Sequence, residues 1–117
     1  MSVTDEELYE VKARMISVLA NPRRLHVVDL LRDGERTVGE IAESLGLAQA
    51  AASQHLALMR RAGLVKTRRE GNRIFYRLGD PKVAAACSVM NQAIVDMLVA
   101  EQRKFLPVLQ PAVRRSR

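Results

Sequence analysis

The sequence has few of the residues that hold small secreted domains together or fill large aromatic cores. It contains one cysteine and four aromatic residues, none of them tryptophan, among 117 residues. A single cysteine excludes an intrachain disulfide framework and suits a reducing cytoplasm. Because 48% of the residues are hydrophobic, the chain can bury roughly two-thirds of its unfolded surface. We therefore expect a single domain over residues 1–117 with an aliphatic core.

Signals for a membrane location are also missing. No apolar run approaches the roughly 20 residues that span a bilayer. The acidic residues Asp5, Glu6 and Glu7 differ from the cationic start of a secretory signal. A membrane-surface role would need a basic amphipathic helix, whereas the excess positive charge here lies mainly on expected strands. These absences predict a cytoplasmic protein with no membrane partner.

Groupings typical of enzyme active sites are not found either. The chain has no glycine-rich phosphate loop, no Ser/His/Asp grouping and only two histidines, His26 and His55. Asp29 follows His26 by three residues, but such a helical pair is more often a surface hydrogen bond. We expect no catalytic residues and no cofactor, so the chain is predicted not to be an enzyme.

The residues from 37 to 62 have the pattern of two short helices joined by a tight turn. Thr37 and Glu40 form a capping box that begins the first helix, and Gly46 is a left-handed stop after it. The second helix is expected from about Gln49 to Ala62. The apolar residues that should face inward are Ile41, Ala42, Leu45, Leu56 and Met59.

Two basic strands follow this helix pair. LVKTRRE and RIFYRL alternate in polarity on either side of Glu70-Gly71-Asn72, which predicts a hairpin. Two helices on a glycine-containing turn followed by a basic ribbon indicate a winged helix-turn-helix over residues 37–78. The predicted fold is mainly α with a small β-hairpin, in the order of four helices, two strands and one helix.

Helices are also expected on both sides of this unit. Thr4 and Glu7 form a capping box for a helix to about Ala20, and Asn21-Pro22 begins a second helix. The last helix should run from Pro81 to about 105 or 106, before a frayed tail at 107–117. Residues expected to be buried by the second helix are Leu25, Val27, Val28 and Leu31.

The first and last helices carry apolar stripes at helical spacing. The stripe of the first helix is Leu8, Val11, Met15 and Val18, and that of the last is Val83, Cys87, Met90, Ile94 and Met97. Such a seam is typical of helices that pack on other helices, although each stripe could also face its own core. A reader of two-fold symmetric DNA needs a dimer interface. We therefore predict a homodimer built from residues 1–20 and 81–106.

Positive charge is concentrated on the expected hairpin. Between Arg60 and Arg77 lie seven cations and one anion, a net charge of +6 that equals the net charge of the whole chain. Edge cations that keep a hairpin soluble are one reason for such a cluster. Neutralisation of phosphates explains the clustering better, so we predict a nucleic-acid partner.

Several short motifs occur in a fixed order over about residues 19–80, just over half of the chain. They are LANPRRL, DGE…VGEIA, S-x-H-L and RREG…YRL. Together they resemble the ArsR/SmtB family of bacterial and archaeal winged-helix repressors. The resemblance implies a cytoplasmic homodimeric repressor that occupies a duplex operator of two-fold symmetry, often its own, and releases it when an inducer binds.

The resemblance also suggests which residues contact DNA. The exposed start and middle of the recognition helix are Gln49, Ala50, Ser53, Gln54 and His55. The two glutamines can hydrogen-bond base edges, and Ser53 and His55 can bond bases or phosphates. For His55, a structural hydrogen bond inside the helix pair is an equal alternative.

Four arginines complete the set of candidate DNA contacts. Arg68, Arg69 and Arg73 would lie along the wing near phosphates or the minor groove, and Arg60 is a further candidate. The sequence departs from the family at Ala48, where a serine often caps the recognition helix. Its absence removes about 1 kcal/mol of capping.

The metal ligands of the family are not found. The segment TVGEIAE has no cysteine pair, and the last helix begins Asp80-Pro81-Lys82, where relatives have Asp-x-His. Ala93 and Asp96 stand at the later ligand positions, and no histidine follows His55. Because borderline metals need three or four nitrogen or sulfur ligands, we predict no metal site.

Other relatives sense sulfide, persulfide or oxidants through two cysteines. Here the position in the second helix is Asp29, and the single thiol is Cys87, so a disulfide within one subunit is impossible. Cys87 on an apolar seam is more often a packed small hydrophobe. The alternative is a thiol sensor, through Cys87 of two subunits or through modification to a persulfide or sulfenic acid.

Two other classes of function remain as alternatives. A winged helix can serve as a module for protein–protein assembly, or it can bind RNA, although the aromatic platform expected for single strands is lacking here. Steep salt dependence of duplex binding would separate a DNA reader from an assembly module. The residues carry no signature of the inducer.

Overall fold

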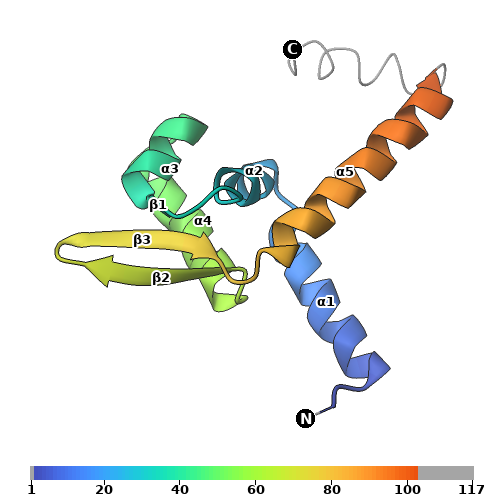
Figure 1. Cartoon of the computed structure of the whole chain (residues 1–117), viewed down its shortest axis with the longest axis horizontal. Coiled ribbons are helices and arrows are strands. Elements are labelled where there is room, and N and C mark those ends of the chain that lie inside the picture. Colours follow the sequence, from blue (N-terminus) through green and yellow to red (C-terminus); the bar gives the residue numbers. More distant parts are fainter. Residues whose placement is uncertain (1, 103–117) are drawn as a thin grey trace. The chain divides into compact units, whose positions relative to one another are not determined.

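The computed structural model describes residues 2–102. Its elements are α1 (Asp5–Leu19), α2 (Pro22–Leu30), β1 (Arg36–Thr37), α3 (Val38–Leu45), α4 (Gln49–Arg61), β2 (Val65–Glu70), β3 (Arg73–Leu78) and α5 (Lys82–Ala100) (Figure 1). The chain divides into one compact unit up to Ala84 and a second unit from Ala85 on. The predicted class, mainly α with a small β wing, is confirmed.

Helices α1, α2 and α3 begin at the positions that their capping residues predicted. Thr4 and Glu7 form a complete capping box at α1, and Thr37 and Glu40 form another at α3. Oδ1 of Asn21 accepts hydrogen bonds from the first backbone N–H groups of α2. These local side-chain bonds satisfy amides that have no partner inside the helix, which fixes the direction in which each helix starts.

Glycines with positive φ form the turn between α3 and α4 and the turn of the hairpin. Gly46 ends α3 with φ of 65°, a left-handed conformation that avoids a steric penalty only without a Cβ. Gly71 has φ of 60° between Glu70 and Arg73. Glycine at the first of two turn residues matches the hairpin turn whose twist suits the flanking strands.

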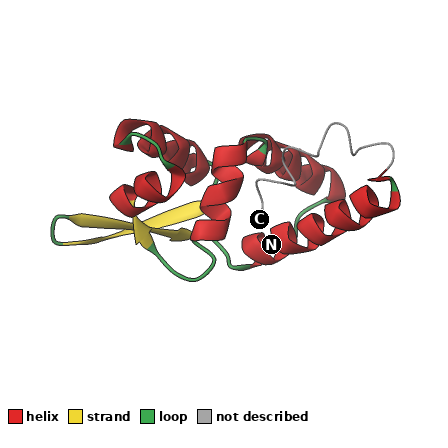
Figure 2. Ribbon diagram, turned by 90° about the horizontal axis from the view of Figure 1, so that it is seen from above, coloured by secondary structure: helices red, strands yellow, loops and turns green. Residues whose placement is uncertain are grey.

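A third strand was not predicted. β1 pairs antiparallel with β3, so the sheet has the order β1-β3-β2. Arg36 stands opposite Tyr76, and Thr37 stands opposite Phe75. The two-residue length of β1 is too short to show an alternating pattern, so the predicted order of elements lacked it. Figure 2 shows the hairpin turn reaching away from the helices of the first unit.

The core of the first unit lies between α2, α3, α4 and the start of β2. Its buried members on these elements are Val27, Val28, Leu31, Ile41, Ala42, Leu45, Ala52, Leu56, Met59, Leu64 and Val65. Leu25 was predicted to be buried, but 45% of it is exposed. Leu25 is three residues before Val28 on a helix of nine residues, and the core accepts only the narrower face that carries Val27, Val28 and Leu31.

Helix α5 corrects one expectation about apolar runs. This helix has 19 residues, and 18 consecutive residues of it have a mean hydropathy of 1.6, so it is long and apolar enough to cross a membrane by length and composition alone. Polar residues interrupt the run, and Nε2 of Gln92 donates to Oδ1 of Asp96 at 2.9 Å. A helix that packs on another protein helix passes the same test. The predicted end of this helix near 105 and the predicted frayed tail lie outside the described residues.

Candidate nucleic-acid interface

One face of α4 is built to be solvent-exposed and the other to be buried. Ala52, Leu56 and Met59 lie in the core at helical spacing. The predicted contact residues Gln49, Ala50, Ser53, Gln54 and Arg60 are all exposed, and of these Ala50 and Gln54 lie on the face opposite the core. Because one face of the helix is fixed in the core, the other presents its polar groups in a defined orientation.

The start of α4 has small side chains and no side-chain cap. Ala48 occupies the N-cap position and makes no capping hydrogen bond. Its carbonyl oxygen accepts from the N–H groups of Ala51 and Ala52, both at 3.1 Å. The N–H groups of Gln49 and Ala50 have no hydrogen-bond partner within the described chain, so they stay available to an acceptor outside the protein.

His55 is half-buried and bonded to another helix. Nη1 of Arg24 lies 3.2 Å from Nδ1 of His55, and Nε of Arg24 donates to the carbonyl oxygen of Val18. Because a guanidinium only donates, Nδ1 accepts and the ring proton sits on Nε2. Arg24 therefore joins the end of α1 and the start of α2 to the recognition helix.

The surroundings of His55 favour its neutral form. Partial burial lowers the pKa of His55, and the positive charges of Arg24 and then Arg23 lower the pKa further. A neutral ring keeps the hydrogen bond from Arg24, whereas an imidazolium would repel it. This geometry gives one ring nitrogen a structural role and leaves the Nε2–H group free of that role. Whether His55 touches DNA stays a prediction.

The register of the hairpin places the wing arginines on two faces. Residues directly opposite each other share a face of the sheet, so Arg68 opposite Phe75 lies on the same face as Arg73 opposite Glu70. Arg69 stands opposite Ile74 on the other face, which also carries the buried Val65. Arg69 is therefore on the side of the sheet that faces the helices.

Arg68 is already bound by two carboxylates. Its Nε lies 2.8 Å from Oε1 of Glu35, its Nη2 also donates to that oxygen, and its Nη1 lies 2.7 Å from Oε2 of Glu70. The guanidinium also lies 4.5 Å from the ring centre of Phe75, with Arg73 at 5.0 Å from the same ring. Planar guanidinium groups favour both kinds of contact.

Charge pairing changes which wing cations are available to a phosphate. Hydrogen bonds from Arg68 lower the pKa of Glu35, and the two carboxylates raise the pKa of Arg68. The described residues show no salt bridge to Arg69 or Arg73. Arg69 and Arg73 are therefore freer to bind phosphate than Arg68, although all three assignments remain predictions.

Two of these structural residues gave no signal in the sequence. Glu35 is 33 residues from Arg68, and Arg24 is 31 residues from His55. Both pairs depend on the tertiary fold, and a charged residue on a helix end or loop is unremarkable by itself. A search for polar residues near the recognition helix would have found them only after the fold was known.

Cys87 lies in α5 and is a half-buried free thiol. Its neighbours on the predicted seam, Met90, Ile94 and Met97, are 60%, 43% and 63% exposed. The packing role and the sensor role of Cys87 both stay predictions. Among residues 2–102, no three His, Cys, Asp or Glu side chains form a group that could hold a metal ion, and the absence of a metal site stays a prediction.

Similar proteins carry the same architecture. Residues 21–67 match the model of bacterial regulatory proteins of the arsR family. The chain is 40% identical over 93 residues to the transcriptional activator HlyU of Vibrio cholerae, covering 79% of this chain and 86% of that protein. It is 44% identical over 72 residues to the biofilm growth-associated repressor of Agrobacterium fabrum, covering 62% of each.

A solved structure extends this likeness to three dimensions. The homodimeric winged helix-turn-helix DNA-binding domain from Mycobacterium bovis superposes with a TM-score of 0.72 at 37% identity, covering 86% of this chain and 93% of that chain. The winged helix-turn-helix description of this relative agrees with the exposed recognition helix and basic wing seen here. This chain therefore belongs to the arsR family of bacterial regulatory proteins and is a DNA-binding transcriptional regulator, not an enzyme.

Proposed function

We propose that the protein is a cytoplasmic homodimeric repressor that binds a duplex operator of two-fold symmetry and is released by an inducer. The observation that carries this proposal is the exposed polar face of α4 beside wing cations that lack carboxylate partners among the described residues. A rigid helix with a polar face suits reading of base edges in the major groove, and the cations suit phosphate binding.

The contact residues divide into two roles. Gln49 and Gln54 read base edges, because an amide can donate and accept at once. Ala50 and Ser53 leave room for close approach of the helix, and Ser53 adds a hydrogen bond. Arg60, Arg69 and Arg73 neutralise phosphates, and these contacts are blind to sequence.

Exposed apolar residues on α1 and α5 supply the dimer interface. Val89, Met90 and Met97 are 72%, 60% and 63% exposed on a helix in which only Ala84 is buried. Burial of such a surface against a second copy is favourable by about 25 cal/mol per Å². The homodimeric M. bovis domain supports a homodimer. Recovery of the protein in the membrane fraction of lysed cells would contradict it.

Fluorescence anisotropy on a duplex from upstream of the protein's own gene tests the proposal. Binding should weaken with salt at a slope of about −0.9 in log K per neutralised phosphate, and a scrambled duplex should bind more weakly. Weak binding that ignores sequence and salt would favour the protein-assembly alternative. Preference for a structured RNA over the duplex would favour the RNA-binding alternative.

Substitutions separate the two roles of the contact residues. Gln49→Ala should cost roughly 1–3 kcal/mol on the operator and little on random duplex, because it removes a base contact. Arg69→Gln should weaken binding to both duplexes equally. Lys12→Gln on α1 removes the same charge away from this surface and is the matched control. Equal losses on both duplexes for Gln49→Ala would refute its role in base reading.

Cys87→Ser tests whether the inducer is an oxidant or a persulfide. If the wild-type protein releases DNA on persulfide or peroxide treatment and the variant does not, the thiol is the switch. If the two proteins respond alike, or neither responds, Cys87 is a packing residue.

A further inference from the structure

A carboxylate from outside the hairpin is bound to the wing. Phe75 on β3 stands opposite Thr37 of β1 on one side and opposite Arg68 of β2 on the other. Glu35 precedes Thr37 by two residues. Arg68 therefore reaches across β3, over the ring of Phe75, to the carboxylate of Glu35. The contact forms only through the tertiary fold, and it places an anion on the basic ribbon.

Two carboxylates occupy the donors through which Arg68 would bind a phosphate. Nε of Arg68 lies 2.8 Å and 2.9 Å from the two carboxylate oxygens of Glu35, and Nη2 donates to the same carboxylate. Nη1 of Arg68 lies 2.7 Å from Oε2 of Glu70. Carboxylates and phosphates bind the same paired donors of a guanidinium. Each donor nitrogen of Arg68 therefore already has an anionic partner.

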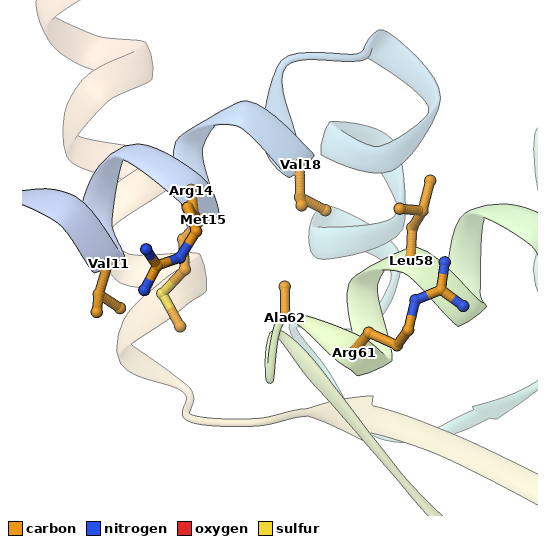
Figure 3. A pocket seen from close by; sticks show the side chains of 7 residues that line it. All are labelled: Val11, Arg14, Met15, Val18, Leu58, Arg61 and Ala62. Carbon is orange, nitrogen blue, oxygen red and sulfur yellow. The ribbon is translucent and has the colours of Figure 1, made fainter.

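The pair of Arg68 and Glu35 contributes little to stability. Their side chains are 44% and 31% exposed, and ion pairs in contact with water stabilise a fold only slightly. Other exposed arginines of the first unit have no such partner. Arg14 and Arg61, which extend away from each other at the groove between α1 and α4 (Figure 3), form no salt bridge within the described residues. The double pairing of Arg68 is therefore a feature of the wing.

We propose that Glu35 competes with DNA phosphates for Arg68 and so lowers the sequence-independent affinity of the protein for DNA. We call this contact the masking of Arg68. The carboxylate of Glu35 takes the place of a phosphate, so one wing cation per subunit does not bind the DNA backbone. The DNA half of the proposal rests on the proposed function, whereas the masking itself does not.

Masking changes the charge that the wing presents to a polyanion. Around Phe75 lie two cations, Arg68 and Arg73, and two anions, Glu35 and Glu70. This part of the wing therefore carries no net charge, although the hairpin sequence is strongly basic. Backbone contacts supply essentially all of the affinity for random DNA. Masking should therefore reduce binding to the many non-operator sites of a genome.

Salt titrations of anisotropy on a scrambled duplex test the proposal. Glu35→Gln should make the slope of log K against log salt steeper by about 0.9 for each additional phosphate. Between about 200 mM and 50 mM salt, its affinity should then rise roughly three- to fourfold more than that of the wild type for each such phosphate. Glu43→Gln is the matched control, because Glu43 is an exposed carboxylate on α3 with no salt bridge within the described residues. Its slope should equal that of the wild type.

Arg68→Gln separates masking from a general loss of negative charge. If Glu35 acts through Arg68, Glu35→Gln should change the slope little in a protein that already carries Arg68→Gln. Equal effects of Glu35→Gln in both backgrounds would overturn the proposal. A slope for Glu35→Gln equal to that for Glu43→Gln would also overturn it.

Glu70→Gln is a second variant that guards against an effect of folding. The side chain of Glu70 is 70% exposed, so its replacement should leave the melting temperature unchanged. It should steepen the slope less than Glu35→Gln, because Glu70 holds one donor nitrogen of Arg68 and Glu35 holds two. Weaker binding of the scrambled duplex by both variants would show that the carboxylates support the wing structurally, and it would refute masking.

Elution from heparin tests masking without an operator. Heparin is a polyanion that has no bases, so it reports the charge that the protein presents. Glu35→Gln should elute at higher salt than both the wild type and Glu43→Gln, and elution of Glu35→Gln together with Glu43→Gln would contradict masking. If the wild type binds no operator while this difference persists, the proposed repressor function fails and the masking of Arg68 stands.

Discussion

The junction between the recognition helix and the wing leaves no room for a side chain at Gly79. A Cβ added there would lie 2.2 Å from the carbonyl oxygen of Gly63 and 3.5 Å from the carbonyl carbon of Leu64. The N–H group of Gly79 also donates to the carbonyl oxygen of Leu64 at 2.9 Å. Gly79→Ala must therefore displace backbone on both sides of the junction, since no flexible side chain can move out of the way.

The size of the effect follows from this distance. Real Cβ contacts are essentially never below 3.0 Å, so the two segments must separate by close to an ångström. Forced expansion of a packed site costs about 1–3 kcal/mol. For a domain of this size, each kcal/mol lowers the melting temperature by about 4 °C, so Gly79→Ala should melt roughly 4–12 °C lower.

Gly39→Ala is the matched control. A Cβ at Gly39 meets its nearest atoms at 3.9 Å, an ordinary van der Waals contact, and the residue lies in α3. Replacing a helical glycine with alanine stabilises by roughly 0.5–1 kcal/mol. The melting temperatures of the two variants, measured by circular dichroism, should therefore shift in opposite directions. All samples need the same protein concentration, because the melting temperature of a dimer depends on concentration. Equal melting temperatures for Gly79→Ala and the wild type would refute the tight junction.

Three further predictions follow from the site. Arg73→Gln should reduce the magnitude of the salt slope of operator binding by about 0.9 for each phosphate that Arg73 neutralises, whereas Arg68→Gln should reduce it less because two carboxylates already hold Arg68. Ala48→Ser should raise the free energy of unfolding by about 1 kcal/mol through a restored cap, as measured by urea unfolding. Because the pKa of His55 is lowered on folding, the unfolded chain binds more protons, so stability should fall as pH drops from about 6.5 through the lowered pKa.

Matched measurements decide each of these predictions. An Arg68→Gln slope change as large as that of Arg73→Gln would show that the carboxylates release Arg68 to DNA. Ala48→Gly, which also caps helices without a side chain, controls for the backbone effect of replacing Ala48. His55→Gln should remove the loss of stability between neutral and mildly acidic pH, and an unchanged pH profile for this variant would contradict the assigned cause.

Local chemistry explains why much of the fold was predictable from the sequence. The capping boxes at Thr4 and Thr37, the Asn21 cap and the left-handed Gly46 depend on residues within one helical turn of each other. The recognition helix was predicted to within one residue for the same reason, since its buried residues recur at helical spacing. Such signals are independent of the rest of the chain.

The parts that were not predicted depend on contacts between distant residues. Strand β1 exists because β3 offers a free edge to Arg36 and Thr37. Leu25 is exposed because the core contacts only the side of α2 that carries Val27 and Val28. The sequence showed seven cations around the wing, but only the register and Glu35 reveal that Arg68 is neutralised and that Arg69 faces the other side of the sheet.

The tight junction also limits how an effector can act on DNA binding. Gly79 packs against the end of α4, so the wing and the recognition helix cannot shift independently without breaking backbone contacts. The recognition helix and wing of one subunit, together called the reader, therefore move as one rigid unit. The DNA affinity of a dimer then depends on the distance between its two readers, which must match half-sites about one helical turn of DNA apart. Helix α1, which has no buried residue, is the element of the first unit most easily moved against the reader. An effector that moves α1 against the reader would therefore change the distance between the two readers of a dimer while leaving the contacts of each reader intact, so it should weaken a two-site operator far more than an isolated half-site.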